Sequence, residues 1–293
     1  MASAEETLDY LYVFLSRAGG LYKQSTRWLR GESANSMRFA SWVTILAMLG
    51  GSAGARAATP TTNVDTCDTE WSQVLALPNR TDQLTRWRQL APKCAKSGLY
   101  EVRLTGLLTV TGQYEEATKA VRGGLALDTP YRKELLGARA AISLSTLQLA
   151  DAQKQFQALI ASYPDYFDGY CGMGALRVME RKFPEAVDYL NQAARHGQSW
   201  LVYRHLTIAY AQLHQDQQAV DAFDKAFRLN PGVVGDKDAI HSAIRSLMFL
   251  GNYRAADGAV KMLLKANPAA GADPEVQQSE RIIQQELSKE GVK

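Results

Sequence analysis

Residues 219–231 read AVDAFDKAFRLNP, and this stretch decides the fold. Ala219 and Phe223 are four residues apart, so they are neighbours on one face of a helix. Ala226 extends that face, and Pro231 follows where the helix has to end, because proline cannot continue it. A small residue beside a large apolar one predicts that this face packs closely against a second helix.

The same pattern returns along the chain at a nearly constant spacing. In every copy an alanine is followed, four positions later, by a large apolar residue. The alanines are Ala117, Ala152, Ala186, Ala219 and Ala256, so successive copies are 35, 34, 33 and 37 residues apart. Their apolar partners are Val121, Phe156, Leu190, Phe223 and Val260. We call these five the key alanines. A period in this range indicates a stack of similar two-helix units.

This period, with Ala-x3-Phe and a terminal proline, resembles the tetratricopeptide repeat (TPR) family over residues 98–270. The resemblance implies an all-α fold, a right-handed solenoid of about five helical hairpins. Gly112 and Gly251 fall in the tight turn between the two helices of a hairpin, where a left-handed backbone suits glycine. Leu147 occupies that position in the second copy, which leaves the fold intact but makes the local geometry uncertain.

The segments that flank the array complete the predicted organisation. Residues 271–293 contain Asp273-Pro274, an N-cap followed by proline at the first helical position, and predict a capping helix. Residues 58–97 combine a Thr-rich linker with two short helical runs, which we interpret as a degenerate leading hairpin. Cys67 and Cys94 bracket this hairpin. A disulfide between them would staple it in an oxidising compartment, and two unpaired thiols are the alternative.

Residues 37–57 have the features of a secretory signal peptide. Arg38 precedes a short apolar run, and Ala55-Arg56-Ala57 is an A-x-A cleavage pattern. An uncleaved membrane anchor is the alternative, and it places the repeats on the same, non-cytoplasmic side. A buried helix of a cytosolic protein is a third interpretation. Membrane association through residues 39–57 stays open. Residues 1–36 are interpreted as an extension that is either not translated in nature or disordered, and an amphipathic helix on a membrane surface is the alternative.

Composition and motif content argue against several functions. The net charge is only +3 and the basic residues are dispersed, so nucleic acid is not an expected partner. Neither the cysteines nor the four histidines have the spacing of zinc ligands, so no metal site is predicted. The sequence contains no G-x-S-x-G, P-loop or G-x-G-x-x-G motif, so we predict neither a cofactor nor catalytic residues.

The TPR resemblance implies that partners bind in a groove lined by the first helix of each hairpin. The N-terminal copies would make an apolar end, suited to a helix or an extended peptide. In the C-terminal copies Arg204, His241 and Arg245 would receive a carboxylate, and solvated or structural polar groups are the alternative. The predicted groove residues are Leu99, Val102, Val110, Leu144, Asp168, Met179, Arg204, Ile208, Gln212, His241 and Arg245.

These features predict a scaffold that binds other proteins and is not an enzyme. With the export segment, the expected site of action is the periplasm of a bacterial cell envelope, within a secretion, pilus, polysaccharide or envelope-biogenesis assembly. The alternative is an inner-membrane adaptor with a retained N-terminal anchor. A third hypothesis, from another class, is an enzyme with a cryptic site in residues 58–97.

Overall fold

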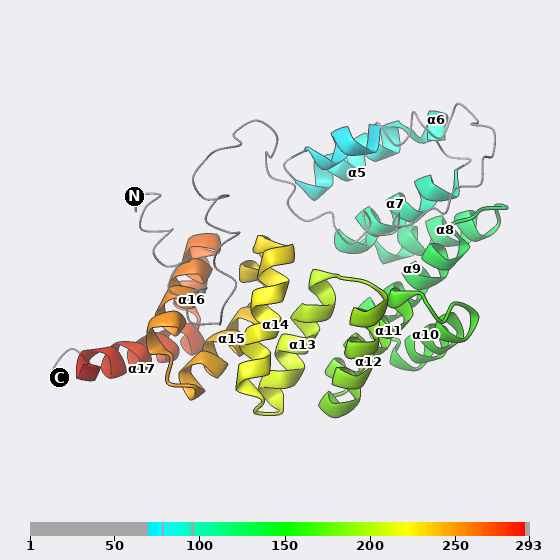
Figure 1. The fold of residues 1–293 in the computed structure, drawn as a ribbon. Helices are drawn as coiled ribbons and strands as arrows, with labels where there is room; N and C mark the ends of the chain where they lie inside the picture. The colour runs from blue at the N-terminus through cyan, green and yellow to red at the C-terminus, as the bar shows by residue number, and fades with distance from the viewer. Residues whose placement is uncertain (1–69, 78, 95–96, 291–293) are drawn as a thin grey trace, which may run out of the picture. The chain divides into compact units, whose positions relative to one another are not determined.

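The computed structural model describes residues 70–290, apart from residues 78 and 95–96. Every regular element in this part of the chain is helical (Figure 1). The extension at 1–36, the signal or anchor segment at 37–57, and Cys67 lie outside the described residues, so the predictions made for them stay predictions.

Five helical hairpins follow one another along the chain, as the period predicts. Each hairpin has a first and a second helix of similar length. In chain order the pairs are α7 (Gly98–Val110) with α8 (Tyr114–Leu125), α9 (Arg132–Ser145) with α10 (Leu149–Ser162), α11 (Phe167–Met179) with α12 (Phe183–His196), α13 (Trp200–Gln212) with α14 (Asp216–Leu229), and α15 (Lys237–Phe249) with α16 (Tyr253–Ala266). The 3-10 turns η2 (Pro231–Gly235) and η3 (Pro268–Ala272) follow the last two hairpins and begin at the prolines of the repeat pattern.

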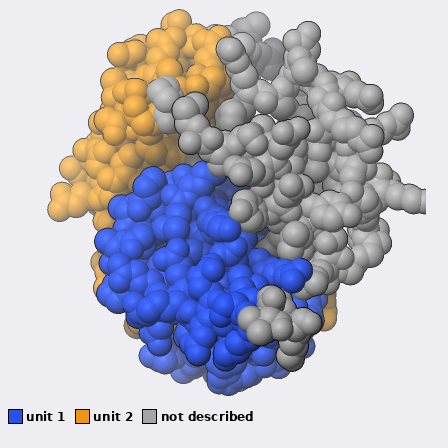
Figure 2. All heavy atoms as spheres, turned by 90° about the vertical axis from the view of Figure 1, so that its left-hand side faces the viewer, with its two compact units in different colours: residues 1–38, 181–187, 200–293 blue, residues 39–180, 188–199 orange. Residues whose placement is uncertain are grey.

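The hairpins group into two compact units, drawn in orange and blue in Figure 2. The described part of the first, here the N-terminal unit, is residues 70–180 and 188–199. The described part of the second, the C-terminal unit, is residues 181–187 and 200–290. The N-terminal unit therefore holds the first three hairpins except for the start of α12, and the C-terminal unit holds the last two.

The repeated alanines lie in the core. All five key alanines are 0% exposed. The apolar residues four positions after them are at most 3% exposed, as the shared helical face requires: Val121 1%, Phe156 3%, Leu190 0%, Phe223 0% and Val260 2%. The small residue lets two helices approach, and the large one fills the space beside it. The sequence pattern is therefore the packing pattern of the core.

The turn inside each hairpin has one conformation, whatever its sequence. A residue with positive φ stands five positions before every key alanine: Gly112 at 75°, Leu147 at 60°, Arg181 at 60°, His214 at 55° and Gly251 at 70°. In the second hairpin the amide of Gln148 donates to the Ser143 carbonyl at 2.8 Å, and the amide of Leu147 donates to the Leu144 carbonyl at 3.0 Å. This pair of bonds is a Schellman motif, which satisfies the last carbonyls of a helix. Leu147 thus adopts the backbone expected of glycine, and its side chain is 69% exposed.

The leading hairpin is built on aromatic packing. Residues 70–75 are helical, followed by α5 (Arg80–Gln89) and the short α6 (Ala91–Cys94). Trp71 and Trp87 are buried with ring centroids 4.7 Å apart, and Trp87 stacks on Tyr100 of α7 at 5.2 Å. The indole N–H of Trp87 donates to the Tyr100 carbonyl at 3.3 Å. These contacts attach the leading hairpin to the first TPR-like hairpin.

The C-terminal cap forms as predicted. Helix α17 (Pro274–Glu290) begins after Asp273, whose carboxylate accepts a hydrogen bond from the Glu275 amide at 3.0 Å. Val276 and Ile283 are buried against the last hairpin, at 2% and 1% exposure. The other positions of α17 are largely polar, so the helix covers the open apolar face of the last repeat.

Candidate binding surfaces

The first helices of the N-terminal unit carry six of the predicted groove residues at different depths. Val110 and Met179 are 50% and 44% exposed, and each stands seven positions before its key alanine, at the end of α7 or α11. Val102 is buried at 1% exposure. The remaining three are half-buried: Leu99, Leu144 and Asp168. Val110 and Met179 are therefore the apolar groups that this face presents most openly.

An acidic residue that sequence reasoning missed stands at the same repeat position as Asp168. Asp168 and Glu134 each stand eighteen positions before a key alanine, in the first turn of α11 and of α9. The side chain of Glu134 is only 6% exposed, and its Oε2 atom has no hydrogen-bond partner in the structure. The Lys133 ammonium is 4.0 Å from the other carboxylate oxygen. The repeat register was the signal that would have found Glu134.

Glu134, Tyr166 and Asp168 form what we call the acidic cluster. Gly137 lies one turn after Glu134, and a Cβ atom placed there would be 3.6 Å from Tyr166 Cε1 and 3.9 Å from the Asp168 Cβ. This face of α9 therefore meets the start of α11. Burial raises the pKa of Asp168 to about 6; the Tyr166 hydroxyl and the Lys133 charge oppose the increase, and the Glu134 charge adds to it. Burial also raises the pKa of Glu134. Both shifts have the sign expected of carboxylates that lack a close counter-charge.

The predicted basic end lies in the C-terminal unit, where Arg204 is engaged by acids of its own chain. Its Nε atom is 2.6 Å from Asp236 Oδ2, and its Nη2 atom is 3.6 Å from Asp238 Oδ2. The Arg204 Nη1 atom lies 3.2 Å from His205 Nδ1. Burial, with the Arg204 charge, lowers the pKa of His205 to about 3, so that imidazole is neutral. These contacts favour the structural interpretation of Arg204 over a role as a free carboxylate receptor.

The other two predicted basic residues differ from each other: His241 contacts an acid of its own chain, and Arg245 does not. The His241 Nδ1 atom lies 2.9 Å from Glu275 Oε2 of the capping helix, and the histidine side chain is 9% exposed. Arg245 is half-buried and makes no ion pair with any residue in the described part of the chain. Ile208 is 9% exposed and Gln212 is half-buried. Of the three predicted basic groups, Arg245 is the one with its guanidinium left for a partner.

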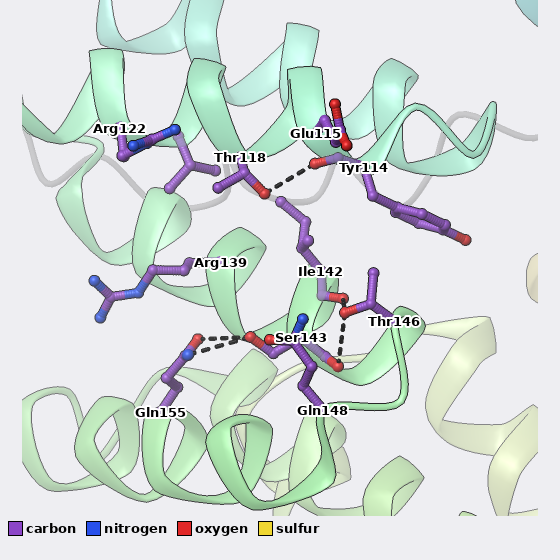
Figure 3. Close-up of a pocket in the computed structure, with 11 residues that line it drawn as sticks. Tyr114, Glu115, Thr118, Arg122, Arg139, Ile142, Ser143, Thr146, Gln148 and Gln155 are labelled. Carbon is purple, nitrogen blue, oxygen red and sulfur yellow. Dashed lines mark hydrogen bonds between the residues drawn. The ribbon is translucent and has the colours of Figure 1, made fainter.

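A separate pocket of about 360 Å³ lies between α8, α9 and α10 of the N-terminal unit (Figure 3). Its polar groups are largely bonded to one another: Gln155 donates to the Ser143 hydroxyl at 3.2 Å, and the Thr118 hydroxyl donates to the Tyr114 carbonyl at 2.8 Å. The lining residues include no histidine, cysteine or aspartate.

No group of three or more His, Cys, Asp or Glu side chains in residues 70–290 is arranged to hold a metal ion. Within the same residues, no helix combines the length and apolar character needed to cross a bilayer.

The sequence matches no protein-family model and no curated protein. Several solved structures match the fold. PilF of Pseudomonas aeruginosa has a TM-score of 0.54 and 13% identity, over 75% of this chain and 98% of that one. PilW, a type IV pilus biogenesis factor, has a TM-score of 0.53 and 16% identity, over 75% and 99%. The Cut9–Hcn1 hetero-tetramer has a TM-score of 0.59 and 12% identity, over 77% of this chain but only 45% of that one. The chain has the tetratricopeptide repeat fold.

Within this TPR fold the first helices of the N-terminal unit are α7, α9 and α11. They carry the acidic cluster near their starts and the exposed Val110 and Met179 at their ends. One TPR face thus combines a buried and a half-buried acid with exposed apolar groups.

Proposed function

We propose that this TPR protein is an interaction scaffold that binds a peptide or helix of a partner protein on the first helices of its N-terminal unit. The observation that carries the proposal is the exposure of Val110 and Met179 at one repeat position on α7 and α11. Large apolar side chains held in water on a repeated face are typical of a surface that a partner covers. Arg245 in the C-terminal unit is a second contact point, suited to an acidic group of the partner.

The cellular setting is part of the same proposal. Residues 37–57 have the pattern of a signal peptide, which supports a periplasmic scaffold in a bacterial envelope; retention of this segment would give an inner-membrane adaptor. PilW is described as a type IV pilus biogenesis factor, and it shares the fold of this chain. This likeness supports an envelope assembly, of pilus, secretion or polysaccharide type, as the client.

A binding role is favoured over catalysis in the leading segment as well. In the described part of residues 58–97, Trp71 and Trp87, the latter on α5, are packed in the core. The buried groups there serve packing and hydrogen bonding, as the Trp87 indole does.

Site-specific photocrosslinking tests the proposed surface. Benzoylphenylalanine at Met179 should give covalent adducts with a partner when the full chain is expressed in its source cells. The matched control is the same residue at Lys154, which is exposed on the second helix α10 of the same unit. Adducts of equal yield at both positions, or none at Met179, would contradict binding on the first helices.

Cell fractionation and N-terminal sequencing test the proposed cellular location and the cleavage of residues 37–57. A periplasmic protein with its N-terminus at Ala58 supports cleavage after Ala57. A larger species that sediments with membranes supports the anchored adaptor. Recovery in the cytoplasm with residues 37–57 intact would rule out both.

A further inference from the structure

The acidic cluster carries more negative charge than its surroundings balance. Glu134 and Asp168 supply two carboxylates, and the Glu134 side chain is 6% exposed with one oxygen lacking a hydrogen-bond partner. The cation beside them is Lys133, whose ammonium lies 4.0 Å from Glu134 Oε1 and whose side chain is 42% exposed. A buried carboxylate is unfavourable unless it is paired and hydrogen-bonded. The cluster therefore has an unmet requirement for positive charge.

In the C-terminal unit this chain places a cation beside an acid at the same repeat position, although the Asp238 side chain is 72% exposed. Asp238 stands eighteen positions before its key alanine, as Asp168 does, and it lies 3.6 Å from the Arg204 guanidinium. Arg204 stands fifteen positions before the preceding key alanine. In the N-terminal unit the residue at the position of Arg204 is Gly137. A Cβ on Gly137 would be 3.9 Å from the Asp168 Cβ, so the two pairs correspond in space as well as in register.

The N-terminal unit thus lacks the side chain that neutralises the acid in the C-terminal unit. A Cβ atom on Gly137 would make only ordinary van der Waals contacts, so the first atom of a side chain fits there. The Tyr166 ring beside it attracts cations, since the Lys133 ammonium lies 5.2 Å from the ring centroid. The cluster thus combines two carboxylates and an aromatic face, and within the described residues Lys133 is its one nearby cation, because Gly137 stands where the C-terminal unit has a guanidinium. This combination suits a receptor for a positive group of another molecule.

We propose that the acidic cluster of Glu134, Tyr166 and Asp168 binds one lysine or arginine side chain of the partner segment. This inference rests on the proposed function, because it names the chemistry of the partner on the same first helices. An organic cation is favoured over a metal ion, because the described residues offer no group of three metal ligands.

The register also sets the spacing that the partner has to match. The acids stand eighteen positions before the key alanines, whereas Val110 and Met179 stand seven positions before them, a difference of eleven residues. Eleven residues of helix span about 16 Å. The partner segment therefore carries its cation about 16 Å from an apolar side chain, a distance covered by about five residues in extended conformation.

An NMR titration of the full chain tests the receptor with a defined probe. The probe is N-acetyl-arginine amide, and the control is N-acetyl-citrulline amide, which has the same shape without the charge. We expect amide shifts in residues 132–137 and 166–169 with the arginine probe alone. Glu134→Gln and Asp168→Asn should each weaken its binding by about tenfold or more, because each removes one of the two charges. Asp151→Asn, at an exposed acid on α10, should bind like the wild type.

A further variant tests whether an arginine at position 137 can take the place that Arg204 has in the C-terminal unit. Gly137→Arg supplies the missing guanidinium from within the chain, in a helix where replacing glycine is favourable. It should occupy the cluster and abolish probe binding while the circular dichroism spectrum stays that of the wild type. If citrulline binds as well as arginine, or if Glu134→Gln and Gly137→Arg bind the probe like the wild type, the receptor proposal is wrong.

The two proposals fail separately. Photocrosslinks at Met179 without arginine binding would keep the scaffold and reject the cation receptor. Arginine binding at the cluster without adducts at Met179 would keep the cation site and reject the proposed partner surface.

Discussion

Gly172→Ala is expected to destabilise the N-terminal unit, although alanine is the better helix former. A Cβ atom at Gly172 in α11 would lie 2.1 Å from Phe156 Cε1 and 2.2 Å from its Cζ atom. Phe156 is the large residue of the second repeat and is 3% exposed, so its ring has little room to withdraw. Overpacking of a core costs about 1–3 kcal/mol, and the depth of this overlap places the cost near 3. Alanine regains about 1 kcal/mol of helix propensity, which leaves a net loss of about 2 kcal/mol.

Gly123→Ala is the matched control, because it makes the same chemical change in another helix of the same unit. Gly123 is exposed on α8, and the nearest atom to its added Cβ is Glu101 Oε1 at 3.9 Å. Nothing opposes the gain in helix propensity, so this variant should be more stable than the wild type by up to about 1 kcal/mol. The two substitutions are thus expected to differ in sign.

Urea denaturation followed by circular dichroism measures both variants. The transition of a repeat protein can be broad, so midpoints are compared only where the slope of the transition is unchanged. The reasoning is refuted if Gly172→Ala is as stable as the wild type, or if both variants shift the midpoint in the same direction. Either result would mean that the Phe156 ring yields more easily than its burial implies.

Three further outcomes are expected. Leu147→Gly should raise the free energy of unfolding by up to about 1 kcal/mol in a thermal or urea melt, because a left-handed backbone costs leucine about 1–2 kcal/mol, and the extra freedom of glycine in the unfolded chain offsets part of the gain. Burial raises the pKa of Glu101 from 4.5 to about 7, so its protonated form stabilises the fold fully below pH 4.5 and this contribution is lost as the pH rises through 7. Glu101→Gln should therefore flatten the pH dependence of the urea midpoint across that range; an unchanged slope would show that another group causes it. Trp87→Ala should cost about 3–5 kcal/mol and expose residues 80–94 to limited proteolysis, because the indole is 0% exposed; protection equal to that of the wild type would contradict this.

The hairpins could be predicted from the sequence because their contacts are local and periodic. Each key alanine and its apolar partner are four residues apart, so one helix displays the whole packing motif. The turn at Leu147 was harder to predict, because the leucine side chain itself disfavours the left-handed backbone that it adopts. Burial of Ala152 and Phe156 on the following helix fixes the turn and overrides that preference.

The candidate site was less predictable because its contacts join distant residues. Nothing in the sequence around Arg204 shows that Asp236, thirty-two residues later, occupies its guanidinium at 2.6 Å. The same holds for His241 and Glu275. In the sequence Glu134 is not distinguished from other acids in the first turn of a helix, where a negative charge is common and favourable. Its burial and its missing partner are visible only once α9 and α11 are packed together.

The shared geometry of the hairpin turns gives this chain one position per repeat at which a label can be attached. The five left-handed residues are all exposed, and they are chemically unrelated: two glycines, a leucine, an arginine and a histidine. At 147, 181 and 214 the turn already carries an exposed side chain on a left-handed backbone, so another side chain can replace it without touching the core. A fluorescent dye at 147, or an inserted epitope at 214, would therefore mark one repeat while leaving the residues of the first-helix faces unaltered. Such labels would make each repeat separately observable while a partner binds.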